Sequence, residues 1–139
     1  MKRTGICILL IVTLLSTMVL PTFAAMPENN TVEPLWTNTS NIDFTVGFID
    51  GVGYAESNVM AKYSPKTFNI ATYVYIKSGS DWVYVTESHH SKTGMSIITS
   101  CAFDAVLWAD YKVDYVFTVS GNGVDEVIPM TAYATYVPS

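Results

Sequence analysis

The segment from residue 111 to residue 120 alternates between two kinds of side chain, and this alternation constrains the fold more than any other feature. Apolar Tyr111, Val113, Tyr115, Phe117 and Val119 alternate with Lys112, Asp114, Val116, Thr118 and Ser120. Successive side chains of an extended strand point to opposite faces, so one face of this segment is expected to lie on a core and the other in solvent. The pattern predicts a half-buried β-strand.

Six further segments show strand signals and are separated by turn residues. They cover residues 42–48, 54–63, 68–77, 82–86, 95–103 and 125–137. In the third, the even positions from Phe68 to Ile76 are expected to face the core. The polar stretch from Glu87 to Gly94 is predicted to be a loop, and Pro129 indicates an edge position or a bulge in the last strand.

Composition supports an all-β fold with almost no helix. After residue 24 only two leucines remain, whereas valine, isoleucine and threonine number 14, 7 and 12. Branched and aromatic side chains suit a pleated, half-buried sheet. Strands at this spacing predict a single immunoglobulin-like antiparallel β-sandwich of about seven strands, with a small antiparallel barrel as the alternative.

The N-terminal residues have the pattern of a secretory signal peptide. Lys2 and Arg3 precede an apolar run from Ile6 to Leu20, and we expect cleavage after Ala24. The predicted organisation is a helical signal peptide (1–24), a flexible leader (25–34) and one domain (35–139). The mature chain holds five lysines, no arginine and twelve acidic residues, a net charge of −7. This excludes a basic nucleic-acid binder, and we expect a secreted protein without a stable membrane anchor.

The chain resembles small secreted Ig-like β-sandwich proteins of Firmicutes, particularly gut clostridia. The residues that carry the resemblance are Leu35 to Thr39, the alternating strand Ile42 to Val46, and the stretch from Tyr111 through Gly121-Asn122-Gly123 to Glu126. The resemblance implies export and this fold, and it assigns no activity. Tyr111 also resembles the tyrosine corner of such sandwiches, whose hydroxyl bonds to upstream backbone; an ordinary core tyrosine is the alternative.

The residues capable of catalysis or metal binding are few and scattered. Cys101, the single mature cysteine, is in phase with a predicted core face, where burial makes a thiol inert. His89 and His90 are adjacent, so in extended chain they point apart and cannot share a metal easily. Asp125 and Glu126 lie beside the glycine turn without the acid-rich loop that calcium needs. We therefore predict no enzyme, no metal and no cofactor; a hydrolase using Ser88 or Cys101 with a histidine is a competing hypothesis.

Aromatic side chains supply the most distinctive functional signal. If the even positions of the third strand face inward, Tyr73 and Tyr75 face out, and Trp36, Trp82 and Trp108 fall near strand ends or in loops. Exposed tyrosine and tryptophan offer rigid contact area with a polar end, which suits an extracellular protein or glycan partner. The sequence thus favours a non-enzymatic binding protein. A bacteriocin-like antagonist of other bacteria is the alternative.

Overall fold

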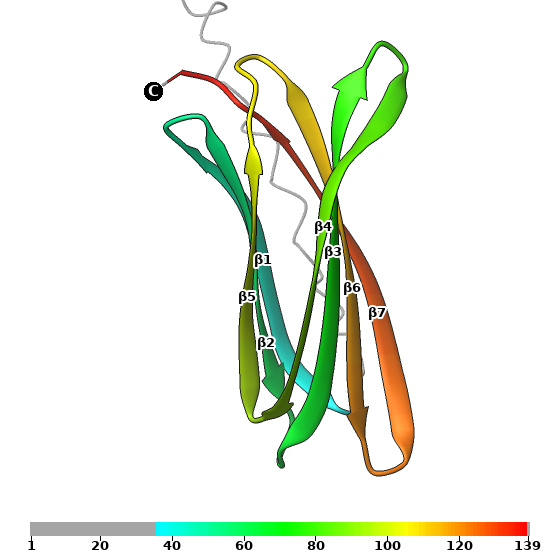
Figure 1. Cartoon of the computed structure of the whole chain (residues 1–139). Coiled ribbons are helices and arrows are strands. Elements are labelled where there is room, and N and C mark those ends of the chain that lie inside the picture. Colours follow the sequence, from blue (N-terminus) through cyan, green and yellow to red (C-terminus); the bar gives the residue numbers. More distant parts are fainter. Residues whose placement is uncertain (1–35, 139) are drawn as a thin grey trace, which may run out of the picture. The chain divides into compact units, whose positions relative to one another are not determined.

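The structure, a computed structural model, describes residues 36–138 and shows an all-β sandwich of seven antiparallel strands (Figure 1). The predicted signal peptide (1–24) and the whole of the predicted leader (25–34) lie outside the described residues. The strands are β1 (Thr39–Ile49), β2 (Val52–Ala61), β3 (Lys66–Ser78), β4 (Asp81–Gly94), β5 (Ser96–Asp104), β6 (Asp110–Gly121) and β7 (Val124–Thr135). The fold class predicted from the alternation is therefore confirmed.

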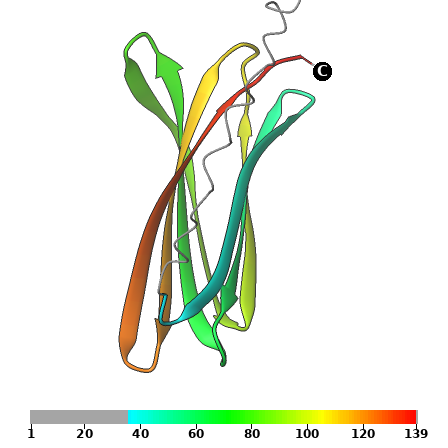
Figure 2. The same ribbon diagram turned by 180° about the vertical axis from the view of Figure 1, so that it is seen from behind.

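The strands form a three-stranded sheet, in the order β1-β2-β5, and a four-stranded sheet, in the order β4-β3-β6-β7. In a constant-type immunoglobulin domain the fourth strand joins the first sheet, whereas here β4 stays beside β3. The two are joined by a tight hairpin with Gly79 at φ 61°, and they remain paired from Ser78–Asp81 down to Lys66–Gly94. The edge strands β1 and β7 lie on the same side of the sandwich (Figure 2).

The core contains the side chains that the alternation predicted. In β3 the even positions Phe68, Ile70, Thr72 and Val74 are buried, and Ile76 is partly buried. In β6 every second residue from Tyr111 to Val119 is at most 1% exposed, which makes β6 the most deeply buried strand. The expected edge position of Pro129 is also confirmed, because β7 ends the four-stranded sheet.

The observed strand bounds differ from the predicted ones by one to three residues at several ends, for example at β7, which ends at Thr135 rather than Val137, and two differences have a clear physical reason. The segment Glu87 to Gly94 was expected to be a loop, but it is the second half of β4. This part of β4 lies at the edge of its sheet, and its side chains are polar and largely exposed. An edge strand of this kind has the same composition as a loop, so the sequence alone did not distinguish the two. The second strand ends at Ala61 rather than Tyr63, whose φ of 66° breaks the extended backbone.

The tyrosine corner is present. The backbone N–H of Val106 donates to the hydroxyl of Tyr111 at 2.8 Å, and the Tyr111 ring is buried. A second tyrosine acts similarly, since the N–H of Gly51 donates to the hydroxyl of Tyr136 at 2.9 Å. Both rings pack on Phe48, with centroid distances of 5.6 and 5.0 Å. These contacts tie the β1–β2 turn and the β5–β6 connection to one aromatic cluster.

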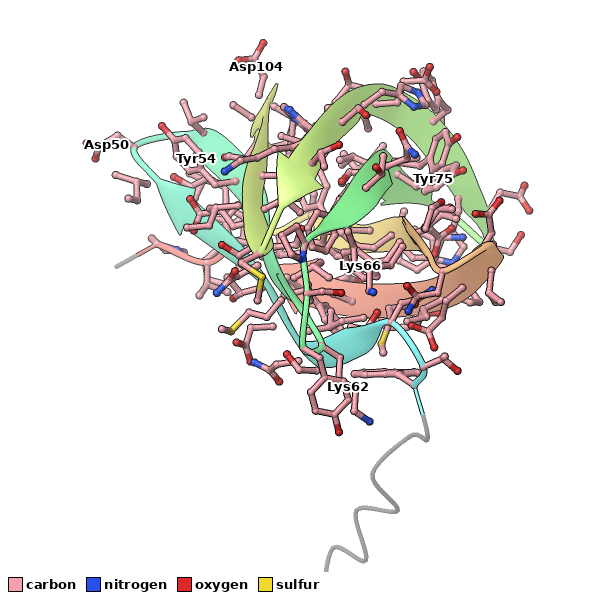
Figure 3. All side chains as sticks on the ribbon, turned by 90° about the horizontal axis from the view of Figure 1, so that it is seen from below. Asp50, Tyr54, Lys62, Lys66, Tyr75 and Asp104 are labelled. Atoms are coloured by element: carbon pink, nitrogen blue, oxygen red, sulfur yellow. The ribbon has the colours of Figure 1, made fainter. Side chains whose placement is uncertain are left out.

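At the opposite end, a lysine side chain closes the space between the sheets. Lys66 points inward and is 3% exposed, and its ammonium group donates to the hydroxyl of Ser64 at 2.9 Å (Figure 3). Its methylene stem covers Gly121, where an added Cβ would come within 2.2 Å of the lysine Cδ. The lysine therefore buries its stem against the core while its charged end reaches a polar partner.

Glu126 fastens the start of β1 to β7. One carboxylate oxygen accepts from the N–H of Thr37 at 2.6 Å, and the other accepts from the Thr39 hydroxyl at 2.7 Å and the N–H of Asn38 at 3.2 Å. The buried Asn38 side chain donates to the carbonyls of Val119 and Val124 at 3.1 and 3.0 Å. Glu126, considered from the sequence only as a calcium ligand, thus holds the start of β1 against β7.

Replacing Glu126 with alanine is expected to lower the free energy of unfolding by about 2–3 kcal/mol, because three bonds to a carboxylate are lost and backbone donors are left unpaired. Chemical denaturation of the two purified proteins measures the difference. Asp125→Ala is the matched control: its side chain is exposed, so a change within about 0.5 kcal/mol is expected. Equal losses in both variants would contradict the anchoring role.

Candidate functional site

Three of the five aromatic residues predicted to bind a partner share the outer face of the four-stranded sheet. Tyr73 and Tyr75 point outward from β3, opposite the buried even positions. A bulge interrupts the β3–β4 pairing after Val74, leaving Val85 as the extra residue, and on its hairpin side Trp82 and Tyr84 pair with Lys77 and Tyr75. The bulge therefore places both β4 aromatics on the outer face.

The outer face of β6 and β7 completes this surface. Lys112 of β6 lies between Tyr75 of β3 and Tyr133 of β7 in the cross-strand register. Tyr133 is 69% exposed. The surface, called the aromatic face below, comprises Tyr73, Tyr75, Lys77, Trp82, Tyr84, Lys112 and Tyr133.

Lysine ammonium groups lie over two of these rings. The Nζ of Lys112 is 4.4 Å from the Tyr75 ring centroid, and the Nζ of Lys77 is 4.8 Å from the Trp82 ring centroid. Lys112 also pairs with Asp114 at 3.0 Å, and the hydrogen bond to that carboxylate raises the lysine pKa. Both are close enough for cation–π attraction, so the aromatic face already carries its own cations.

Trp82 and Tyr133 meet across the sheet. Two strands separate β4 from β7, which corresponds to about 14 Å of sheet, yet the two ring centroids are only 5.8 Å apart, at 48°. The side chains must therefore lean toward each other over β3 and β6. Beside them is a recess of about 410 Å³. Its lining residues are Lys77, Trp82, Asp110, Tyr111, Tyr133, Ala134 and Thr135.

The recess combines aromatic walls with a few polar groups. Asp110 accepts a hydrogen bond from the Thr135 hydroxyl at 2.6 Å, and Lys77 donates to the Ser80 carbonyl at 3.2 Å. A carboxylate accepts more than one hydrogen bond and an ammonium group has three donors, so both retain capacity for a ligand. This is the usual chemistry of a small-molecule site: mostly apolar or aromatic walls with a few placed polar groups.

The other two predicted aromatics do not belong to this face. Trp36 is partly buried against the core, and its carbonyl accepts from Lys62 at 3.3 Å. Trp108 is 70% exposed in the β5–β6 connection with φ at 65°, and it does not line the recess. Neither position could be assigned from the alternation, because both residues lie outside the strands.

Sequence reasoning missed four residues of the aromatic face: Lys77, Tyr84, Lys112 and Tyr133. The alternation of residues 111–120 placed Lys112 outward, but gave no sign of a ring beside it. Tyr84 follows Trp82 by two residues, which is the spacing of one strand face. That spacing was the available signal for Tyr84.

The residues considered for catalysis are not gathered in one pocket. His89 points outward, 3.3 Å from a Glu87 oxygen, whereas the hydroxyl of Ser88 is buried. Cys101 is 5% exposed in the core. His89 and His90 do line one recess with Ser91, on the lower half of β4. Within residues 36–138, no three histidine, cysteine or acidic side chains are grouped as metal ligands.

Cys101→Ala is expected to lower the free energy of unfolding by about 1–2 kcal/mol, through the small cavity left in the core. The folded wild-type protein is expected to react with a thiol reagent only after denaturant is added, because the sulfur is buried. Thiol titration with and without urea measures this. Rapid labelling of the folded protein would contradict the assignment of Cys101 to the core.

Comparison with known proteins leaves the chain without an assigned family. No family model matches, and no curated protein matches. A crystal structure of a protein from Archaeoglobus fulgidus is 8% identical, with a TM-score of 0.46, over 73% of this chain and 98% of the other. A solution structure of a protein from Arabidopsis thaliana is 11% identical, with a TM-score of 0.44, over 70% of this chain and 77% of the other.

Similarity at this level assigns neither family nor function. Among residues 36–138, no helix is long and apolar enough to cross a bilayer.

Proposed function

We propose that this chain is an exported, non-enzymatic binding module that attaches to an extracellular partner through the aromatic face. Export, and kinship with small secreted sandwich proteins of Firmicutes, form part of the same proposal and rest on the sequence alone. The observation that carries the binding role is the gathering of four tyrosines, one tryptophan and two lysines on one sheet face.

The opposite face of the sandwich differs in chemistry. The outward positions of β1, β2 and β5 include three carboxylates, Asp43, Glu56 and Asp104, with no lysine. Among these outward positions one side chain is aromatic, that of Tyr54. It lies on the three-stranded sheet, whereas Tyr75 lies on the four-stranded sheet (Figure 3). Rings and cations are therefore concentrated on one side. Tyrosine and tryptophan dominate binding energy at protein surfaces, so the aromatic face is the favoured contact surface.

The test compares variants matched by residue type. Trp82→Ala and Tyr75→Ala remove rings from the aromatic face; Trp108→Ala and Tyr54→Ala remove the same ring types elsewhere. The readout is binding of the fluorescently labelled chain to intact bacteria and to immobilised intestinal mucus. The first pair is expected to lose at least tenfold in affinity, and the second pair less than twofold.

Equal losses in both pairs would overturn the assignment of the face. Absence of wild-type binding to both surfaces would overturn the binding function. Circular dichroism of all four variants serves as the folding control.

A further inference from the structure

The recess beside Trp82 and Tyr133 has the chemistry of a site for a neutral sugar ring. We infer that it is a glycan subsite, which rests on the proposed function and narrows its partner to an uncharged polysaccharide. Three features of the structure carry the inference: the meeting of two rings across the sheet, the polar groups that share their recess, and the charges already present on the face.

The rings supply the stacking surface. A pyranose has a face of C–H groups, whose partial positive charge matches the negative face of an aromatic ring. Trp82 and Tyr133 lie at 48° to each other, so together they form an angled wall rather than a flat plate. The Lys77 ammonium lies over one face of the Trp82 ring, so the 69% exposed Tyr133 ring offers the stacking face for a sugar, and Trp82 forms the adjacent side of the recess. Trp82 and Tyr133 both line the recess, and each carries a polar group, an indole N–H and a hydroxyl, that can bond to a ligand hydroxyl.

The polar groups supply orientation. Sugar hydroxyls both donate and accept, so they need a strong acceptor and a strong donor within the same recess. Asp110 is the acceptor, already held in place by the Thr135 hydroxyl at 2.6 Å, and the Lys77 ammonium is the donor. Because a hydroxyl bound to a charged group makes a stronger hydrogen bond than one bound to a neutral group, two such contacts would fix the ring's orientation.

The charges exclude ionic ligands. Lys77 and Lys112 occupy the cation positions over Trp82 and Tyr75, so a cationic ligand would meet like charge where it would otherwise bind. A polyanion would approach a chain whose mature form has a net charge of −7, and Asp110 and Asp114 lie on the same outer face as the two lysines. An uncharged sugar avoids both costs.

The experiment measures binding of the mature chain to defined oligosaccharides by isothermal titration. Cellohexaose, chitohexaose, xylohexaose and mannohexaose are the neutral probes; polygalacturonate and chitosan are the anionic and cationic ones. At least one neutral hexasaccharide is expected to bind, with affinity changing less than twofold between low and high salt, because no ion pair is formed. Binding only of polygalacturonate or chitosan would overturn the inference.

Variants locate the site. Trp82→Ala is expected to lower the affinity for the neutral ligand at least tenfold. Asp110→Asn is expected to lower it three- to tenfold, since an amide replaces the carboxylate acceptor but still accepts from Thr135. Trp108→Ala is the control and is expected to change affinity less than twofold. Unchanged binding in both recess variants would overturn the assignment of the recess.

The outcomes separate this inference from the proposed function. If no neutral hexasaccharide binds, but attachment to bacteria or mucus still depends on Trp82 and is lost after protease treatment of that surface, the partner is a protein. The sugar assignment then fails while the binding function stands. If neither oligosaccharide nor surface binding is found, both fail.

Discussion

Replacing Tyr115 with aspartate is expected to leave the chain unfolded at room temperature. The Tyr115 side chain is completely buried, and its ring stacks on Phe117 at a centroid distance of 5.7 Å. Truncating such a ring costs about 3–5 kcal/mol, and the new carboxylate would be buried without a partner, at a cost of several kcal/mol more. A domain of this size is stable by only about 5–15 kcal/mol. Far-ultraviolet circular dichroism without a cooperative thermal transition is the expected observation.

Tyr115→Phe is the matched control. The Tyr115 hydroxyl crosses the core and donates to the carbonyl of Thr45 at 3.0 Å, with the Glu56 carbonyl at 3.4 Å. Burial raises its pKa above the ordinary tyrosine value, so it remains a protonated donor. Losing this hydroxyl should cost about 1–2 kcal/mol, because the hydrogen bond that it donates across the core is lost, and the fold should persist. Val113→Asp, at an equally buried position of β6, should behave like Tyr115→Asp; a folded protein in either case would contradict the burial of this face.

The second large effect is expected at Gly53. This residue faces inward from β2, and an added Cβ would lie 2.2 Å from the Phe103 ring. That ring cannot move freely, because it is packed in the aromatic cluster at 6.3 Å from Phe48 and 5.1 Å from Tyr111. Overpacking of this kind costs about 1–3 kcal/mol, and we expect Gly53→Ala to reach about 3 kcal/mol in chemical denaturation.

Gly121→Ala provides an unusually close comparison. Its Cβ would also come within 2.2 Å of a side-chain atom, but that atom belongs to the flexible stem of Lys66. A lysine can change rotamer, so a loss of about 1 kcal/mol is expected. Phe103→Leu should partly relieve Gly53→Ala, giving a double variant more stable than the sum of the single losses. Equal costs at the two glycines would show that the rigidity of the aromatic cluster is irrelevant.

Alternation predicted the core well because it is a local property. The even positions of β3 and the odd positions of β6 could be assigned to the core without knowledge of any partner strand. Alternation did not identify Glu87 to Gly94 as a strand, because an edge strand exposed to water has no apolar face and so shows no apolar–polar alternation. It also failed for Met95, which continues the apolar phase of β5 yet lies outside that strand and is exposed.

The candidate site could be predicted only in part. Tyr73 and Tyr75 followed from the phase of one strand, whereas the meeting of Trp82 with Tyr133 depends on the order of four strands and on a bulge. The role of Glu126 depends on residues more than 80 positions earlier in the chain. Contacts of this range arise from topology, which one local pattern does not specify.

The anchoring of β1 by Glu126 has a mechanical consequence. The chain enters the sandwich beside Glu126 and leaves at the other end, after β7, so a pull between residues 36 and 138 acts along the strands (Figure 1). The hydrogen bonds from Thr37, Asn38 and Thr39 to one carboxylate would then be loaded together, in shear, rather than opened one after another. Single-molecule stretching should therefore show a lower unfolding force for Glu126→Ala. A domain that holds a partner in flowing fluid would depend on that resistance.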